Sequence, residues 1–252
     1  MVSALLERLR QGHRTAPYPK APPTVPPRLR GLPVLQPGKC PVGCGDCVSA
    51  CPTAAITRDE RGLALDMGRC LFCTDCTSAC SHGAVSFSSD HKLVASSREA
   101  LVVRDAPPPR AEPLRPDLRK LLGRALKIRV VSAGGCNACE ADVNVLGTPV
   151  FDLGRFGIQV VASPRHADAV LVTGPVSDNM KLGLEKTYKA TPDPKIVIAV
   201  GACAISGGPY AGHPEQHDGA GSVVPIDVYI PGCPPHPYTI LDGLLRALGR
   251  IA

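Results

Sequence analysis

Cysteine is the residue whose spacing indicates the clearest chemistry in this sequence. Twelve cysteines are present; ten fall in three tight runs, and the other two each follow a short apolar segment. Twelve cysteines divide into three sets of four, and four thiolates are what one cubane [4Fe–4S] cluster requires. The sequence therefore predicts three [4Fe–4S] clusters and a chain that relays single electrons.

The second run, from Cys70 to Cys80, has the C-x2-C-x2-C-x3-C spacing of half a bacterial ferredoxin. In that pattern three thiolates hold one cluster and the fourth reaches across to the sister cluster. Zinc is the alternative, but zinc sites typically use two separated ligand pairs rather than a triplet plus one. The ferredoxin rule predicts a first set of Cys40, Cys44, Cys47 and Cys80, and a second set of Cys51, Cys70, Cys73 and Cys76.

The first run departs from that spacing. Three residues separate Cys40 from Cys44 where the pattern has two. Gly43 and Gly45 are suited to absorb the extra residue, since glycine accepts backbone conformations that other residues avoid. If they do not absorb it, we expect this cluster to be labile or differently ligated. A milder departure is Ser81, which replaces the usual proline after the last cysteine.

The C-terminal half of the chain has the pattern of an α/β fold. Helices are expected over 118–126, 178–190 and 237–250. Continuous apolar strands that alternate with helices favour a parallel sheet covered on both faces. The expected strands are 127–132, 158–163, 168–173, 195–200 and 227–232.

This topology explains how four distant cysteines meet. Cys136 and Cys139 follow the first expected strand, Cys203 follows the fourth and Cys233 follows the fifth. In open parallel sheets, sites form in the crevice beyond the carboxyl ends of the strands. We therefore expect these four thiols to converge there.

The segment that contains the two four-cysteine runs resembles a known family. Residues 38–105, with the tail FSSDHKLVASSREALVVRD, are similar to the two-cluster ferredoxin subunit of respiratory complex I and of membrane-bound [NiFe] hydrogenases. The resemblance implies a ferredoxin-like α+β domain that binds two [4Fe–4S] clusters.

The C-terminal half resembles the small, cluster-bearing subunit shared by complex I and the group 4, energy-converting [NiFe] hydrogenases. The residues that carry this likeness are GGCNACEAD, SPRHADAVLVTGPVSDNM, PKIVIAVGACAISGG and VYIPGCPPHPYTILDGLLRAL. The resemblance implies a flavodoxin-like fold. It also implies that the ligands of a proximal [4Fe–4S] cluster are Cys136, Cys139, Cys203 and Cys233.

The spacing of the first two of these ligands separates the branches of the family. In complex I they are adjacent, whereas here Asn137 and Ala138 lie between them, as in the hydrogenases. This favours a hydrogenase-like complex, in which a separate large subunit holds nickel. A quinone-reducing, complex I-like module and a free-standing polyferredoxin remain alternatives. The other partners implied are membrane-arm subunits and a soluble electron donor or acceptor, and we expect no nucleic-acid partner.

Several polar residues near the cysteines are candidates for tuning a cluster. Glu140 lies at an expected helix start and is a candidate proton or subunit contact beside the cluster; the alternative is that its carboxylate only complements the helix dipole. Arg165 and His166 belong to a family block and are candidates to tune the cluster or to face the catalytic partner, with a structural role as the alternative. His82 and His236 are candidates to donate a hydrogen bond to a cluster sulfur. The chain has no nucleophile, acid–base pair or nickel-ligand set, so we expect no turnover without its partners.

The division of the chain follows from composition. Residues 1–37 form a proline-rich arm with seven Lys or Arg and one acidic residue before Cys40. The arm is expected either to meet anionic lipid or an acidic partner, or to be a solvated tail. Residues 38–105 form the ferredoxin-like domain, 106–117 a stiff linker, and 118–252 the α/β domain.

No segment approaches the roughly 18 apolar residues of a membrane span. The first residues have the pattern of a short amphipathic helix without a signal-peptide core or a twin-arginine signal. We expect a cytoplasmic protein held at the inner membrane's cytoplasmic face through partner subunits.

Overall fold

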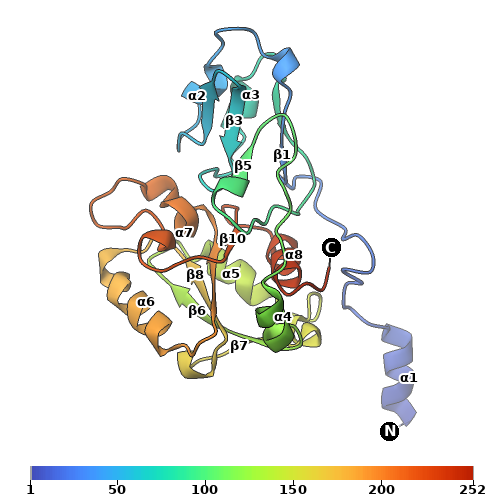
Figure 1. The fold of residues 1–252 in the computed structure, drawn as a ribbon. Coiled ribbons are helices and arrows are strands. Elements are labelled where there is room, and N and C mark those ends of the chain that lie inside the picture. Colours follow the sequence, from blue (N-terminus) through green and yellow to red (C-terminus); the bar gives the residue numbers. More distant parts are fainter. Residues whose placement is uncertain (1, 252) are drawn as a thin grey trace.

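The computed structural model describes residues 2–251. Figure 1 shows a parallel-sheet domain, a smaller module of short strands and helices stacked on it, and a terminal helix that projects away from both. No helix among the described residues is long and apolar enough to cross a membrane.

The larger domain is built on a five-stranded parallel sheet. Its strand order is β10-β9-β8-β6-β7. Numbered from 1 to 5 along the domain and read from the β7 edge, this is the order 2-1-3-4-5. This is the flavodoxin-like order, so the structure agrees with the fold expected from sequence. The strands are β6 (Leu126–Ser132), β7 (Ile158–Val160), β8 (Ala169–Thr173), β9 (Ile196–Val200) and β10 (Val228–Ile230).

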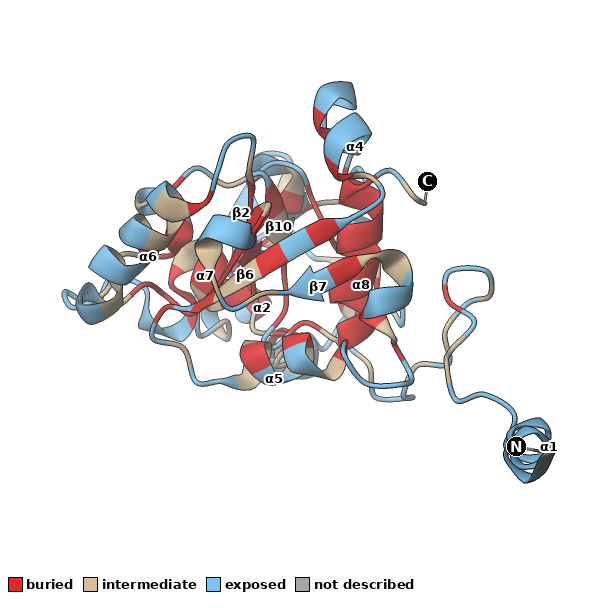
Figure 2. Cartoon of the chain, turned by 90° about the horizontal axis from the view of Figure 1, so that it is seen from below, coloured by how far each residue is buried: buried red, intermediate tan, exposed pale blue. Residues whose placement is uncertain are grey.

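Burial explains the apolar strands. Every residue of β8 and β9 is buried, and Figure 2 shows the sheet strands enclosed by helices. A central strand covered on both faces has no solvent side, so its sequence does not alternate. The covering helices are α4 (Pro116–Leu122), α5 (Ala138–Val145), α6 (Asp178–Ala190), α7 (Ala202–Ser206) and α8 (Pro237–Ala247).

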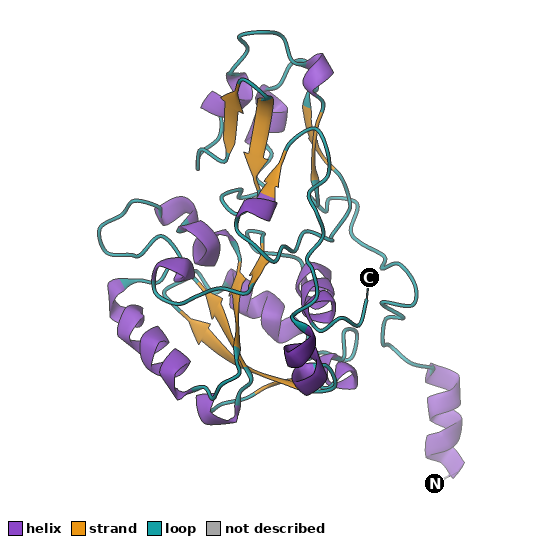
Figure 3. Ribbon diagram, viewed as in Figure 1, coloured by secondary structure: helices purple, strands orange, loops and turns teal. Residues whose placement is uncertain are grey.

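The smaller module, which contains the first eight cysteines, is built from short helices and strands (Figure 3). It contains a two-stranded and a three-stranded antiparallel sheet, of order β1-β4 and β2-β3-β5. Its elements are β1 (Pro33–Leu35), α2 (Asp46–Ser49), β2 (Ile56–Asp59), β3 (Gly62–Asp66), α3 (Asp75–Ala79), β4 (Val85–Phe87) and β5 (Val102–Val103). Each of the two four-cysteine runs contains one short helix, α2 in the first run and α3 in the second.

Short 3-10 turns complete the chain. They are η1 (Pro37–Lys39), η2 (Glu99–Leu101), η3 (Leu153–Phe156), η4 (Pro164–His166), η5 (Gly208–Tyr210) and η6 (Ala220–Ser222).

The two modules share one apolar core. Ala199, Ala204 and Ile205 of the sheet domain pack in the same buried cluster as Leu65 and Met67 of the smaller module. Polar contacts cross the same boundary. The Ser206 hydroxyl donates to the carbonyl of Gly68 at 2.8 Å, and Ala95 forms a β-bridge with Tyr229. The modules are therefore packed against each other and not only tethered.

The expected domain limits differ from the observed ones at the N-terminal side. The expected arm of residues 1–37 contains β1, whose Pro33 pairs with Phe87 inside the smaller module. The same arm contains Tyr18, which is 5% exposed and packs in the core of the sheet domain. Only α1 (Val2–Gln11) stands clear of the body (Figure 1). The arm is therefore a strap across both modules rather than a solvated tail.

The linker and its neighbouring helix also differ. The helix expected over 118–126 begins at Pro116 and ends at Leu122. Proline is favoured in a first helical turn because its missing N–H has no partner there. Ala111, in the expected linker, is buried and donates its N–H to the carbonyl of Val94.

Candidate iron–sulfur sites

The second cysteine set lines one small cavity. Cys51, Cys70, Cys73 and Cys76 border it together with apolar side chains such as Ile56. Burial raises the pKa of Cys70 to about 12, and the nearby thiols of Cys76, Cys51 and Cys73 add to the rise. Burial also raises the pKa of Cys76, again with a contribution from Cys51 and Cys73. The structure brings together the four residues expected from the spacing.

The first set also gathers in one place. Burial raises the pKa of Cys47, and the thiols of Cys80, Cys40 and Cys44 add to the rise in that order. Cys47 lies in α2 and is buried, whereas the other three are partly exposed. The set therefore lies nearer the solvent than the second set.

Backbone N–H groups point at several of these sulfurs. Ala55 donates to Cys51 Sγ at 3.2 Å, Phe72 to Cys70 Sγ at 3.3 Å and Ala84 to Cys80 Sγ at 3.2 Å. Donors of this kind stabilise thiolate and set the potential of an iron–sulfur cluster. At Cys80 burial opposes ionisation, but backbone donors from Ala84 and its neighbours lower the pKa below its ordinary value.

The turn that accommodates the extra residue in the first run is visible. Cys44 donates its N–H to the carbonyl of Pro41 at 3.3 Å, which closes a four-residue turn. Gly43, its third residue, has φ +84°, and this turn position favours glycine. Gly45 has φ −133°, so it does not need glycine's freedom. Val42 is fully exposed at the tip.

The C-terminal set converges beyond the carboxyl ends of the strands. Cys136 and Cys139 follow β6, Cys203 lies in α7 after β9, and Cys233 follows β10. Burial raises the pKa of Cys203 to about 11, with contributions from Cys233 and Cys136. Burial raises the pKa of Cys139 as well, with Cys203 as the next largest cause. Cys136 and Cys233 are exposed, so this site opens to the surface.

Two glycines make room for this set. A Cβ at Gly201, whose φ is +89°, would lie 2.5 Å from the Sγ of Cys139. A Cβ at Gly208 would lie 2.9 Å from the Sγ of Cys203. Both contacts are too close for any side chain, so the backbone here is shaped around the sulfurs.

Glu140 is next to the C-terminal set, and its side chain has a defined role. It is 8% exposed, and its Oε1 accepts hydrogen bonds from Ser132 Oγ at 2.6 Å and Thr173 Oγ1 at 2.7 Å. Burial opposes its ionisation, but these two hydroxyls lower its pKa below the ordinary value. Its charge in turn raises the pKa of Cys139. The carboxylate therefore joins two sheet strands to the site rather than only complementing a helix dipole.

Arg165 and His166 are not brought to the cysteines. Both are exposed in η4, before β8 begins at Ala169. They line a surface pocket with Lys127 and Pro192, at the amino ends of the strands. In a parallel sheet that edge is opposite to the carboxyl edge, where the cysteines lie. The expectation that these two residues tune the proximal cluster is wrong.

The two candidate histidines do not direct their rings at sulfur. His82 is exposed, and its backbone N–H is the group that faces Cys80. His236 accepts a hydrogen bond at Nδ1 from the Tyr238 N–H at 3.1 Å and so caps α8. Burial lowers the pKa of His236. Each residue therefore acts through the backbone or as a helix cap.

A cavity of about 560 Å³ is lined by residues of both the smaller module and the C-terminal set. Leu71 and Phe72 line it from one side, Cys233 and His236 from the other, and Asp142 from α5. Burial raises the pKa of Asp142. Leu71 also lines the cavity of the second cysteine set. The second set and the C-terminal set are thus neighbours.

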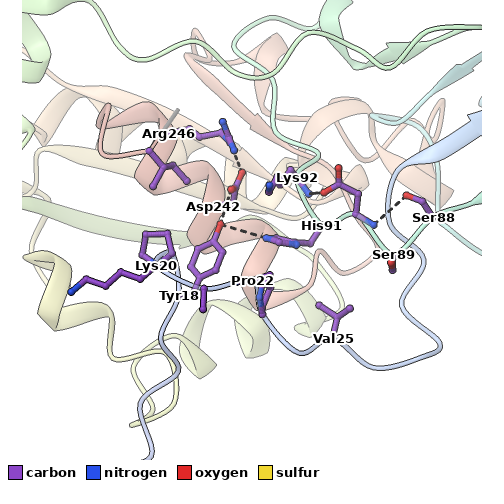
Figure 4. A pocket seen from close by; sticks show the side chains of 15 residues that line it. Tyr18, Lys20, Pro22, Val25, Ser88, Ser89, His91, Lys92, Asp242 and Arg246 are labelled. Carbon is purple, nitrogen blue, oxygen red and sulfur yellow. Dashed lines mark hydrogen bonds and ion pairs between the residues drawn. The ribbon is translucent and has the colours of Figure 1, made fainter.

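A buried polar network anchors the N-terminal strap, and sequence reasoning did not find it. The Tyr18 hydroxyl donates to Asp242 Oδ1 at 2.7 Å, and Arg246 Nε donates to Asp242 Oδ2 at 2.7 Å. Asp242 has no exposed surface. Figure 4 shows these side chains with His91 beside a cavity of about 620 Å³. Burial, followed by Asp242, raises the pKa of Tyr18, which keeps the hydroxyl a donor.

The residues present fit three [4Fe–4S] clusters. Each set offers four thiols, the ligand number that the cubane requires. The second set encloses a cavity, backbone donors face the sulfurs, and glycines leave space where sulfur approaches the chain. These features define an α/β domain with a dicluster ferredoxin-like module.

Comparison with known proteins identifies the family. Residues 136–247 match the family described as NADH ubiquinone oxidoreductase, 20 Kd subunit, and residues 39–84 match the 4Fe-4S dicluster domain. The chain belongs to this 20 kDa subunit family and carries the dicluster domain in the same polypeptide. The resemblance expected from the cysteine blocks is confirmed.

Three relatives span both branches of the family. The probable membrane-bound hydrogenase subunit mbhJ of Pyrococcus furiosus is 43% identical over 135 residues, 54% of this chain and 81% of that protein. Formate hydrogenlyase subunit 7 of Escherichia coli is 44% identical over 138 residues, 55% of this chain and 54% of that protein. An NADH-quinone oxidoreductase subunit of Heliobacterium modesticaldum is 38% identical over 120 residues, 47% of this chain and 69% of that protein. The chain is therefore an iron–sulfur subunit of the oxidoreductase type.

Proposed function

We propose that this chain relays single electrons within a membrane-associated, energy-converting [NiFe]-hydrogenase-like complex, between a redox donor or acceptor and a catalytic large subunit. Three [4Fe–4S] clusters would supply the one-electron chemistry. The observation that carries the proposal is the gathering of twelve cysteines into three sets of four, with the second set beside the C-terminal set.

Each set has a distinct task in this proposal. The first set, Cys40, Cys44, Cys47 and Cys80, lies nearer the solvent than the second set and would meet the soluble donor or acceptor. The second set, Cys51, Cys70, Cys73 and Cys76, lies between the other two. The C-terminal set, Cys136, Cys139, Cys203 and Cys233, would face the large subunit. The exposure of Cys136 and Cys233 supports that last assignment, because a docked subunit would cover them.

The spacing of Cys136 and Cys139 favours hydrogen as the substrate of the complex. Asn137, the first residue between the two cysteines, has φ +70° and precedes the first turn of α5. Two of the compared relatives are named as hydrogenase or formate hydrogenlyase subunits. A complex I-like module that reduces quinone is the second candidate, favoured by the 38% identity to a protein of the NADH-quinone oxidoreductase.

We place the chain at the cytoplasmic face of the inner membrane, held through membrane-arm partner subunits. The exposed side chains of α1 support a direct contribution to this placement. Leu5, Leu6 and Leu9 are 64%, 61% and 80% exposed, and Arg8 and Arg10 flank them around the helix. A short helix with an apolar face and basic flanks suits the surface of an anionic membrane.

The test is hydrogen-dependent viologen reduction by the native complex, isolated anaerobically on this chain. We expect activity in the wild type and its loss in Cys136→Ser with the large subunit still present. An intact, iron-replete complex without hydrogen activity would instead support the quinone-reducing candidate.

A further inference from the structure

Arg58 connects β2 to the loop that holds the first two cysteines. Its Nη2 donates to the carbonyl of Pro41 at 3.2 Å, and its Nη1 donates to the carbonyl of Cys44. The same Nη1 lies 3.5 Å from the Sγ of Cys40. One guanidinium thus contacts both ends of the Pro41–Cys44 turn and a cysteine sulfur.

These contacts coincide with the extra residue of the first run. The turn protrudes into solvent: Val42 is fully exposed, and a Cβ at Gly43 would meet no atom within 4 Å. The only turn-closing bond inside it is the long one from Cys44 to Pro41, at 3.3 Å. A loop with so few contacts needs an outside anchor to hold two cysteines at fixed positions. The planar fork of arginine suits two carbonyl acceptors in a way that lysine's single ammonium does not.

The charge of Arg58 has a second consequence. A positive group beside a cysteine sulfur favours the more negative state of whatever that sulfur ligates, and charge and hydrogen bonds to sulfur are levers on cluster potential. No other side-chain donor contacts a sulfur of the first set among the hydrogen bonds of residues 2–251; the further donors at Cys80 are backbone N–H groups, that of Ala84 and those of its neighbours. Arg58 is therefore the charged side chain that donates to a sulfur of this set among residues 2–251.

We propose that Arg58 is a positioning residue of the first set: it anchors the enlarged Cys40–Cys44 loop and raises the reduction potential of the cluster held there. The inference rests on the proposed function, because it requires this set to bind a [4Fe–4S] cluster. The potential of the solvent-facing cluster would then depend on a side chain that the spacing of the cysteines does not reveal.

The experiment is a redox titration followed by electron paramagnetic resonance on the full chain in its complex, for wild type, Arg58→Gln, Arg58→Lys and Arg61→Gln. Arg61 is the matched control, since it lies three residues away, is exposed and pairs with Asp59 rather than a cysteine. Iron analysis of the wild type comes first. Fewer than about twelve irons per chain, with no reducible cluster at the first set, would refute the proposed function rather than this inference.

With the clusters present, Arg58→Gln is expected to lower the ratio of reduced to oxidised cluster several-fold at fixed potential, for one cluster only. A tenfold fall corresponds to about 59 mV for one electron. The difference from wild type should shrink at high salt, because Arg58 is exposed and its charge is screened. Arg61→Gln should leave all three potentials unchanged.

If Arg58→Gln loses about four irons per chain, the anchoring role is supported, and Arg58→Lys then tests the charge. That variant keeps the cation but loses the fork, so its cluster potential should keep the salt dependence of the wild type. Unchanged iron content and unchanged potentials in Arg58→Gln would overturn the inference. An equal shift in Arg61→Gln, or an Arg58→Lys cluster that ignores salt, would also overturn it.

Discussion

Cys73 of the smaller module lies beside Cys233 of the sheet domain. Burial raises the pKa of Cys233, and the nearby thiols of Cys136 and Cys73 add to the rise. The two cysteines belong to different modules and are far apart in the sequence. Their closeness follows from the shared apolar core of the modules, in which Ile205 packs with Met67. The second set and the C-terminal set are therefore neighbours, as the proposed electron relay requires.

The iron content of the chain should fall in steps of one set. Replacing Cys47, Cys76 or Cys139 by Ala should each lower the content by about four irons from about twelve, because each belongs to a different set of four ligands. Anaerobic iron and sulfide analysis measures this, with Ser49→Ala as the control on the exposed surface of α2. A variant that keeps all its iron would contradict the prediction that its set of cysteines binds a cluster.

The network under the N-terminal strap should be important for stability. Asp242→Ala leaves the buried Arg246 guanidinium without its partner, which should cost about 3–5 kcal/mol of unfolding free energy. Tyr18→Phe removes the contacts of the hydroxyl with Asp242 and His91 and should cost about 1–3 kcal/mol, because a buried acceptor is left unpaired. Denaturant unfolding monitors both. Asp117, in an exposed pair with Arg115, is the control and should change stability by less than about 0.5 kcal/mol when replaced by Ala. Equal effects of Asp242→Ala and Asp117→Ala would contradict the network's role.

Stability should fall on acidification through His91. Burial lowers the pKa of this histidine below 6.5, despite the opposing charge of Asp242. The unfolded chain therefore binds the proton more readily, so this contribution is present above pH 6.5 and is lost as pH falls through the lower, folded-state pKa. Thermal unfolding of His91→Gln between pH 7.5 and 5 should show a weaker pH dependence than the wild type. Parallel curves would exclude His91 as a cause.

Removing the apolar face of α1 should weaken membrane contact. Changing Leu5, Leu6 and Leu9 together to Ser should reduce cosedimentation with vesicles that contain phosphatidylserine, because the apolar face supplies the burial and the arginines supply the attraction. Gln11→Ala is the control, because it removes only a polar side chain that is hydrogen-bonded to Glu7 and leaves the apolar face intact. If the triple variant binds vesicles as well as the wild type but no longer copurifies with the complex, α1 binds an acidic protein partner rather than the membrane.

Local patterns predicted much of the fold. The helix expected over 178–190 is α6 with the same limits. All five expected strands are present: β6 begins one residue earlier than expected, and the other four are shortened by one to three residues. A helix start was expected at Glu140, which lies in the first turn of α5. Helix α7 was not anticipated, because it is short and begins beside a glycine and a cysteine. The grouping of cysteines followed from spacing for the first eight, and from the topology of a parallel sheet for the last four.

The contacts that sequence could not reveal join distant segments. Tyr18 and Asp242 are 224 positions apart, and the sequence around each residue contains no pattern that predicts their contact. In the sequence, nothing distinguishes Arg58 from the other arginines. Only the structure shows that β2 places it against the Pro41–Cys44 turn. Arg165 and His166 were misplaced because a family block is continuous in sequence, whereas the chain runs from one edge of the sheet to the other within it.

The most direct test of the relay is to reduce the native complex with hydrogen and follow the iron–sulfur signals by electron paramagnetic resonance. In the wild type, signals from all three cysteine sets should appear under hydrogen. In Cys139→Ala, the signals of the two ferredoxin-type sets should be absent under hydrogen yet appear with dithionite, because electrons from the large subunit must pass the C-terminal set. Reduction of those two sets by hydrogen at the wild-type rate in Cys139→Ala would contradict the account.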